Sequence, residues 1–517
     1  AIRCILMGSE TFRFTGTGCP HPLPVETFRS TMTLDQASPS LKHFVLLMCI
    51  PLLLACQSGR KETRPNIVVI FTDDQTYRAI GYNNPGIHTP ELDRLAEEGI
   101  IFQNHYTATP ICAASRASMM TGLFPQQHGT IALDSESFIE EVCNNPEYPT
   151  IARLLNQADY QTWFSGKSHL GPPQAYGFKK GGIFHDPKDS AAFSNALEMI
   201  GEYQTGNEPF FLWLAPRQPH VPLIPDDRWL NLYDTSCIAL PGNFRESPLM
   251  QSMFNQGLPG EFFFRDSDHT RNWKNLPAGP PRSVAVIKDF TKAYYATISN
   301  LDHQVGMLVD ALEQKGLKEN TVIIFLSDNG YFLGNHGLGN KITMHEESVR
   351  VPLFIHWDGL QKKGFECRQL VSSLDVFPTV LELAGIPVPG HVFGTSLIPL
   401  FRDPETPIHD YVASECVGKG GKTGQGHRMV RTLQWKYILT GTSEEVLYDE
   451  LGDPDELVNL IHERPEMAGQ MREYLAGWMN QTGDRHTLPG VTDPSDISVS
   501  TRVRENGITE IIIRSAN

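Results

Sequence analysis

Two pairs of oxygen-bearing residues, each directly after an apolar run, are the first candidates for chemistry. Asp73 and Asp74 follow residues 66–71, and Asp328 and Asn329 follow a second such run. Carboxylate and amide oxygens suit a hard divalent cation, so Ca²⁺ or Mg²⁺ is the expected metal. Acidic residues in this position also cap helices, and the metal interpretation therefore depends on the groups around them.

Short clusters of basic residues follow other apolar runs. They contain Lys167, His169, His220, His336 and Lys341, with Arg350 further along the chain. A single histidine or lysine of this kind most often has a structural role or lies in solvent. Together, these side chains would surround an anion with positive charge and offer an acid or base near neutral pH.

A cysteine in an unusual setting completes the candidate chemistry. Cys112 opens the stretch CAASR (112–116), and Thr121 and Gly122 follow a few residues later. We expect this cysteine to be exposed and to give rise to a nucleophile. The alternative is an inert buried thiol or a metal ligand.

Alternating strands and helices would position these groups. Residues 66–71, 209–215 and 320–330 contain continuous apolar runs, which are typical of strands buried on both faces. A cap at Thr89 and a stop at Gly99 mark one intervening helix. The pattern predicts an α/β fold with a large, mainly parallel sheet covered on both faces. Ligands gather at the carboxyl ends of such strands, so both acidic pairs are expected to share one site.

The chain is expected to divide into one large and one small folded part. Residues 65–403 form the predicted catalytic domain, and residues 404–517 form a smaller α+β subdomain. A helix in the second part carries one apolar stripe, which we interpret as core rather than as a cofactor site. The stripe consists of Met467, Met471, Leu475 and Trp478.

The N-terminal residues have the pattern of an export signal. A basic start and a short apolar run precede Cys56, and the sequence LLAC resembles a bacterial lipobox. We predict upstream sequence without a fold in residues 1–31, a lipoprotein-type signal peptide in residues 32–55 and a linker in residues 56–64. Cys56 would carry lipid, and the protein would be periplasmic or lie on the cell surface. The alternative is a buried apolar strand.

The overall charge limits the classes of partner. The chain has 517 residues and a formal net charge of −16, from 59 acidic and 43 basic residues. We therefore expect no nucleic-acid partner, although a few basic residues can still bind an anionic substrate. The nine cysteines show no CxxC pair, and the sequence leaves any disulfide unassigned.

The stretch CAASR, followed by Thr121 and Gly122, resembles the modification signature of type I, formylglycine-dependent sulfatases. Further landmarks of that family are matched in order between about residues 65 and 480. They are NIVVIFTDDQ, GKSHLG, PHVP, SDNG, LGNKITMHEESVRVPL and LYDELGDPDELVNL. The resemblance implies an alkaline-phosphatase-like α/β/α sandwich with a smaller C-terminal α+β subdomain.

For Cys112, the resemblance implies a modification rather than a thiol nucleophile. A formylglycine-generating enzyme or an anaerobic sulfatase-maturating enzyme would oxidise this cysteine to formylglycine. One oxygen of the hydrated aldehyde would attack sulfur and displace the alcohol, and the second hydroxyl would then expel sulfate by re-forming the aldehyde. By the same resemblance, one Ca²⁺, favoured over Mg²⁺, would be bound by Asp73, Asp74, Asp328, Asn329 and the residue derived from Cys112.

The resemblance also assigns roles to the basic residues. Arg116 and Lys167 would orient the diol and neutralise charge, and His169 would contact a diol hydroxyl. His220 and Lys341 would hold the sulfate oxygens, together with Lys167. His220 is the better candidate for protonating the leaving oxygen.

Four positions carry secondary expectations. Ser115 would serve recognition by the maturation enzyme, and His336 would contact substrate. Ala114 stands where many members have Pro, which bears on the choice of maturation enzyme. Ser168 stands where an aromatic residue is common, which bears on pocket shape.

The predicted function is hydrolysis of sulfuric esters in sulfated glycans. Two alternatives stay open: a phosphonate monoester hydrolase or phosphodiesterase of the same superfamily, and an inactive glycan-binding relative. Residues 240–285 look like an irregular insertion whose aromatic and basic residues either clamp a sugar or pack on the body, and packing is favoured. Those residues are Phe254, Phe262 to Phe264, Arg265 and Trp273.

Overall fold

The computed structural model contains two compact units, residues 1–63 and residues 64–517. Within the first, it describes an antiparallel pair of short strands, β1 (Arg3–Cys4) and β2 (Phe14–Thr15). The predicted signal peptide and Cys56 lie outside the described residues. In the second unit the described residues are 64–131, 145, 147–204, 208–245, 283–360, 362–416, 426–441, 443–484, 497–503 and 509–515.

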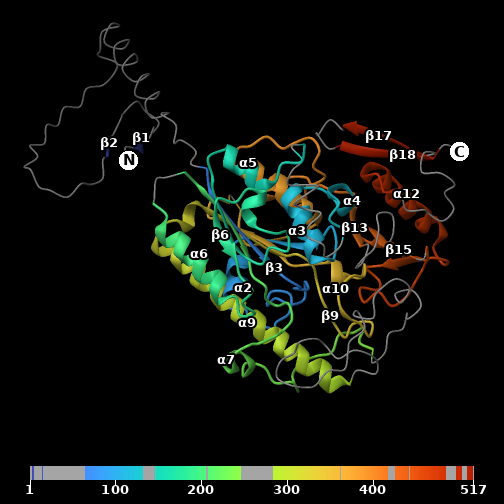
Figure 1. The fold of residues 1–517 in the computed structure, drawn as a ribbon. Helices are drawn as coiled ribbons and strands as arrows, with labels where there is room; N and C mark the ends of the chain where they lie inside the picture. Colours follow the sequence, from blue (N-terminus) through green and yellow to red (C-terminus); the bar gives the residue numbers. More distant parts are fainter. Residues whose placement is uncertain are drawn as a thin grey trace, which may run out of the picture. The chain divides into compact units, whose positions relative to one another are not determined.

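An eight-stranded sheet forms the centre of the second unit (Figure 1), in the order β12-β4-β11-β8-β3-β7-β5-β6. The strands are β3 (Asn66–Thr72), β4 (Ile100–Tyr106), β5 (Gln161–Gly166), β6 (Lys180–Ile183), β7 (Phe210–Ala215), β8 (Thr321–Ser327), β11 (Leu353–His356) and β12 (Phe365–Ser372). Neighbouring strands are parallel except β11, which is antiparallel to β4 and β8. The predicted mainly parallel sheet is confirmed.

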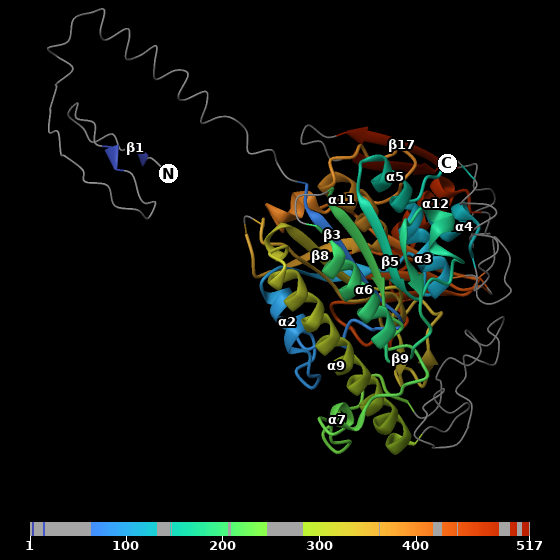
Figure 2. The same ribbon diagram turned by 60° about the vertical axis from the view of Figure 1, so that its left-hand side comes forward.

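Helices cover both faces of the sheet because its central strands are apolar on both sides. On β3, Val69 and Phe71 face one apolar core, and Val68 and Ile70 face the other. The first core includes α3 (Cys112–Thr121), α5 (Ile151–Gln157) and α11 (Val376–Leu383). The second includes α2 (Pro90–Glu97), α6 (Ser190–Glu202) and α9 (Val284–Gln314), which run together in Figure 2. This arrangement is the expected α/β/α sandwich.

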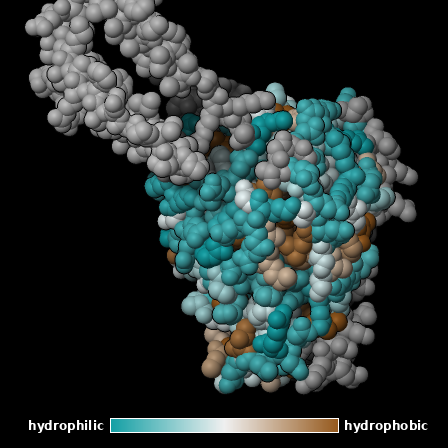
Figure 3. Space-filling model, turned by 90° about the vertical axis from the view of Figure 1, so that its left-hand side faces the viewer, coloured by the Kyte–Doolittle hydropathy of each residue, from teal (hydrophilic) through white to brown (hydrophobic). Residues whose placement is uncertain are grey.

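The outer side of this helical layer is polar, as expected of helices that bury one stripe. Figure 3 shows the face that lies on the left in Figure 1, and it is mainly hydrophilic with apolar residues in small groups. Among the described residues, no helix has the length and apolar character needed to cross a membrane. Short elements complete this part: α4 (Pro125–His128), α7 (Asp227–Leu230), β9 (Phe332–Leu333), β10 (Gly339–Asn340) and α10 (Glu346–Val349).

A smaller antiparallel sheet follows the large one, with its strands in chain order. They are β13 (Val412–Cys416), β14 (His427–Arg431), β15 (Trp435–Leu439) and β16 (Glu445–Asp449). On α12 (Pro465–Thr482), Met471, Leu475 and Trp478 are buried in the same core as this sheet, and Met467 packs against it partly buried. The pair β17 (Ile497–Val503) and β18 (Thr509–Ser515) comes last. The small α+β part and the core interpretation of the apolar stripe are confirmed.

The side chain of Trp213 provides a test of this packing. Trp213 is 1% exposed on the central strand β7, and its ring centre lies 5.2 Å from that of Phe71. We expect Trp213→Ala to lower the free energy of unfolding by about 3–5 kcal/mol, measured by urea denaturation. The control Leu451→Ala, at a side chain 72% exposed, should change it by less than about 0.5 kcal/mol. Equal effects of the two substitutions would contradict the packing described here.

Candidate active site

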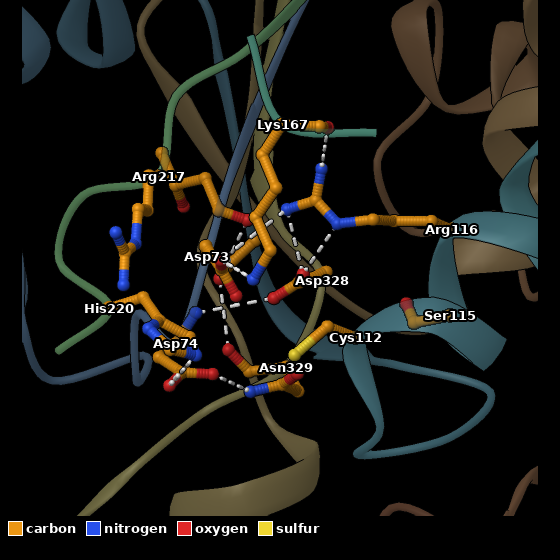
Figure 4. Close-up of polar contacts among 12 residues, drawn as sticks. Asp73, Asp74, Cys112, Ser115, Arg116, Lys167, Arg217, His220, Asp328 and Asn329 are labelled. Atoms are coloured by element: carbon orange, nitrogen blue, oxygen red, sulfur yellow. Dashed lines mark hydrogen bonds and ion pairs between the residues drawn. The ribbon is translucent and has the colours of Figure 1, made fainter. Parts of the chain in front are cut away.

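Adjacent strands bring the predicted site residues together. β3 and β8 end side by side, with Thr72 opposite Ser327, so both acidic pairs leave the sheet at the same point. β7 and β5 are the next strands in the sheet, and the segments after them carry His220 and Lys167. Figure 4 shows these side chains gathered around one centre, with Cys112 entering from the start of α3.

Hydrogen bonds fix the acidic residues relative to one another. Asn329 Nδ2 donates to Asp74 Oδ1 over 2.7 Å, and the backbone N–H of Asp74 donates to Asp328 Oδ1 over 3.2 Å. Arg116 donates from Nε and Nη2 to Asp328 Oδ2, over 3.0 and 2.8 Å. Its Nη1 donates to the backbone carbonyl of Lys167 over 2.8 Å. The structure therefore places Arg116 on Asp328, where it orients that carboxylate.

Two buried lysines neutralise the other carboxylates. Lys167 bonds to Oδ2 of Asp73, and Lys341 bonds to Oδ1 of Asp74. Lys341 Nζ also lies 2.7 Å from Cys112 Sγ. Together with the Arg116–Asp328 ion pair, these contacts set three carboxylates against three side-chain cations. The site is buried and excludes most water.

Burial and charge shift the acids in opposite directions. Burial alone would raise the pKa of Asp73, but the positive charges of Lys167, His220 and Arg116 hold it well below its ordinary value. For Asp328, burial and the negative charge of Asp73 raise the pKa, although Arg116 binds this carboxyl. The two acids compete for the same positive charge, and a further cation would favour the ionised form of both.

The residues present fit a divalent cation. Two buried oxygens, Asp73 Oδ1 and Asn329 Oδ1, have no hydrogen-bond partner among the described residues, which is rare for buried polar atoms. Ligand atoms from Asp73, Asp74, Cys112 and His220 all lie within 4.8 Å of one another. Oxygen ligands of this kind suit Ca²⁺. His220 is not among the metal ligands expected from the sequence, because its motif indicates substrate contact.

The setting of Cys112 differs from the sequence expectation. It is 1% exposed, so the prediction of an exposed cysteine is wrong. The small side chains of Ala113 and Ala114, both buried, let α3 pack closely at this point. Burial raises the pKa of the thiol to about 12, despite the positive charges of Lys167 and Lys341. An unmodified thiol here stays protonated at neutral pH and is a poor nucleophile.

The two histidines near the centre differ in orientation. His220 Nδ1 donates to the carbonyl of Val221, so Nε2 faces the acids, 3.8 Å from Asp74 Oδ2. Burial and the positive charge of Lys167 lower the pKa of His220 to about 4. His169 is exposed, and its backbone has a positive φ of 59°.

His336 lies in a separate cluster. Asn243 Nδ2 lies 3.0 Å from His336 Nε2, and Glu347 Oε2 lies 3.7 Å from the same nitrogen. The substrate contact expected of His336 stays a prediction. The aromatic and basic residues of the expected insertion, from 254 to 273, lie outside the described residues.

Several supporting residues carried no signal in the sequence. Thr107 Oγ1 donates to the carbonyl of Asp328 over 2.8 Å and lies 3.2 Å from Ser115 Oγ. Tyr294 on α9 donates from its hydroxyl to the carbonyl of Asp74. These residues are far in sequence from the groups that they support, so no spacing pattern marks them.

The segment that carries His220 has its own anchor. The carboxylate of Asp189 accepts the backbone N–H groups of Arg217 and Gln218, each over 2.8 Å. Asp189 is 2% exposed, and burial raises its pKa to about 7, although the two N–H groups oppose this shift. The position of His220 therefore depends on an acid outside the predicted set.

Comparisons with known proteins agree on one family. The sulfatase family model matches residues 65–386. A second model, the C-terminal part of N-sulphoglucosamine sulphohydrolase, matches residues 334–481. Together these models span the large sheet and the small one.

Individual relatives cover most of the chain. An N-acetylglucosamine-6-O-sulfatase from Bacteroides thetaiotaomicron is 28% identical over 503 residues, covering 82% of this chain and 87% of the relative. The structure of BT4656 with its substrate D-glucosamine-2-N,6-O-disulfate has a TM-score of 0.69 and 24% identity, covering 82% and 99% of the two chains. A phosphonate monoester hydrolase of Agrobacterium radiobacter has a TM-score of 0.70 and 19% identity, covering 87% and 100%. At these identities, the likeness to solved structures shows the fold alone.

The burial of Cys112 predicts low reactivity toward alkylating reagents. In native, unmodified protein at pH 8, iodoacetamide should label the exposed Cys237 and leave Cys112 unlabelled, as read by peptide mass spectrometry. After unfolding in guanidinium, both cysteines should react. Equal labelling of the two in the native protein would show that the thiol is accessible, contrary to this structure.

Proposed function

Since this chain belongs to the sulfatase family, we propose that it removes sulfate from sulfated carbohydrates. The nucleophile would be formylglycine made from Cys112, and the site would also bind one Ca²⁺. The observation that carries the proposal is the position of Cys112. Its Sγ lies 2.7 Å from Lys341 Nζ and within 4.8 Å of candidate metal ligands on Asp73, Asp74 and His220. The choice of a sulfated sugar as substrate is supported by the N-acetylglucosamine-6-O-sulfatase relative.

Modification of Cys112 would overcome the low reactivity of the thiol. With a pKa of about 12, the thiol remains protonated at neutral pH. Formylglycine, in its hydrated form, would supply an oxygen nucleophile and a route for releasing sulfate. A formylglycine-generating enzyme or an anaerobic sulfatase-maturating enzyme would carry out this oxidation of Cys112.

A bound Ca²⁺ would give the site its affinity for an anion. Asp73, Asp74, Asp328 and Asn329 would hold the ion, using Asp73 Oδ1 and Asn329 Oδ1, which have no hydrogen-bond partner among the described residues. The ion would stabilise negative charge on the oxygens that react. Because the protein's own charges are balanced, with three carboxylates facing three cations, the ion leaves an excess of positive charge that attracts an anionic ester.

His220 and Lys341 would act on the substrate directly. The Nδ1–H of His220 is held by the carbonyl of Val221, so Nε2 is the atom that would give a proton to the leaving alcohol oxygen. A sulfate ester bound beside the ring favours its protonated form, because the negative charge opposes the effect of Lys167. The Lys341 ammonium, next to Cys112, would hold a sulfate oxygen.

We also propose that the protein acts outside the cytoplasm. The sequence pattern before Cys56 supports export and attachment to a membrane through lipid. An enzyme in that location would meet sulfated glycans outside the cytoplasm.

Sulfate release tests the reaction class. We expect the protein, co-expressed with a maturation enzyme, to release sulfate from one or more of a panel of sulfated sugars that includes N-acetylglucosamine 6-sulfate, measured by ion chromatography. Cys112→Ala should lower the rate by more than about 10³-fold while leaving the circular dichroism spectrum unchanged.

Phosphate and phosphonate esters of matched structure form the control. Release of phosphate or phosphonate products without sulfate would assign the protein to the phosphodiesterase branch of the superfamily. No release from any ester, with formylglycine confirmed by the mass of the peptide that contains residue 112, would favour the inactive glycan-binding alternative.

Calcium binding can be tested without turnover. We expect CaCl₂ to raise the melting temperature of the protein and EGTA to reverse the shift, because a ligand that binds the native state stabilises it. Asp73→Asn should raise the Ca²⁺ concentration needed for half of the melting-temperature shift by at least about 100-fold. The control Glu415→Gln, which alters a buried acid on β13, should keep the dependence of the unaltered protein. An unchanged dependence in Asp73→Asn would remove Asp73 from the metal site.

A further inference from the structure

A second buried cluster of charges lies between the segment that carries Lys341 and the small sheet. At its centre is Lys436 on β15, which is fully buried. Its Nζ lies 2.5 Å from Glu346 Oε1, 2.7 Å from Glu456 Oε1 and 3.4 Å from Glu450 Oε1. Removing one partner from a buried ion cluster leaves an uncompensated charge, which strongly destabilises its surroundings.

Glu346 is the member of the cluster that belongs to the Lys341 segment. It begins α10, and its backbone N–H donates to Glu456 Oε2 over 2.8 Å. Its second carboxylate oxygen accepts from Tyr106 over 3.1 Å and from Arg350 Nη1 over 3.2 Å. The start of α10 is thus fixed through both its backbone and its side chain.

The turn that presents Lys341 is strained. The residues on either side, Asn340 and Ile342, have positive φ angles of 64° and 87°. A positive φ is rare for a β-branched residue, and such a conformation persists only where the surroundings enforce it. Local links add to this: Asn340 pairs with Phe332 of β9, and the N–H of Ile342 donates to Ser348 Oγ over 3.0 Å.

The surroundings that enforce this turn come largely from the small sheet. Ile342, Met344 and Val349 are buried in one apolar cluster with residues of all four of its strands. Those residues are Val412, Cys416, Met429, Ile438, Val446 and Tyr448. Apolar packing on one side and the ion cluster at the start of α10 together hold the segment to the sheet.

We propose that Lys436 is a positioning residue that, through Glu346, holds the strained turn on which Lys341 reaches Cys112. The inference rests on the proposed function, in which Lys341 holds a sulfate oxygen. Lys436 itself has no contact with Cys112 among those that the structure describes. The small sheet would thereby contribute to the position of an active-site residue.

A double-mutant cycle distinguishes positioning from general stabilisation. In Lys436→Met, kcat/KM for the panel sugar that the unaltered protein desulfates fastest should fall by about 100-fold, as expected when a contact group is displaced by about 1 Å. In a Lys341→Ala background, the same substitution should lower kcat/KM by less than about threefold, because the residue it positions is gone. An equal loss in both backgrounds would overturn the inference.

A second buried ion pair, with one partner on the same sheet, supplies a matched control. Arg428 on β14 is fully buried and bonds Asp484 through Nε over 2.7 Å, outside the cluster around Glu346. Arg428→Met should lower the melting temperature as Lys436→Met does and keep kcat/KM within about threefold. If Lys436→Met does not fold, Glu346→Gln is used in its place. This variant removes the charge that links Lys436 to the turn, while Lys436 keeps Glu450 and Glu456 as partners, so a smaller loss of stability is expected.

A chemical probe tests the inference without turnover. Reductive methylation with formaldehyde, read by peptide mass spectrometry, should modify Lys341 about tenfold faster in Lys436→Met than in the unaltered protein or in Arg428→Met, because the turn opens locally. Equal rates in the three proteins would overturn the inference. Absence of sulfate release by the unaltered protein would contradict the proposed function instead, and the methylation rates would still decide whether Lys436 positions Lys341.

Discussion

A balance of buried charge at the carboxyl ends of β3 and β8 is the constraint on which the rest of the structure depends. Burying Asp73, Asp74 and Asp328 without partners would cost several kcal/mol for each ion. Arg116 and two lysines compensate them, and each of these cations comes from a different part of the chain. The fold must therefore bring α3, the segment after β5 and the segment before α10 to one point before the acids can be ionised together.

The same need for compensation explains why the site is surrounded by polar anchors. Tyr294 reaches from the long helix α9 to the backbone of Asp74, and Asp189 fixes the backbone before His220. Among the hydrogen bonds of the described residues, none joins either side chain to Cys112. They satisfy backbone groups of irregular segments that are buried, and such groups are rarely left without a partner. The helical layer is thus part of the support of the site as well as the cover of the sheet.

The small sheet is joined to the large one by charge as well as by apolar packing. Glu346 belongs to the segment before β11, and Lys436 and Glu456 belong to the C-terminal part. An ion cluster of this kind is sensitive to geometry, because each group depends on the exact placement of its partners, whereas apolar contacts tolerate small shifts. This difference suits a segment whose backbone, at Ile342, has a conformation that it would not adopt alone.

The sequence by itself determined three central strands of the large sheet, one covering helix and the identity of the residues at the strand ends, because apolar periodicity and short motifs are local properties. It therefore predicted the mainly parallel sheet and the grouping of the acidic pairs. The tertiary structure alone decided that Cys112 is buried, that Arg116 rests on Asp328 and that His336 lies beside Glu347. Those facts depend on contacts between residues far apart in the chain, and burial and charge compensation arise only when such residues meet.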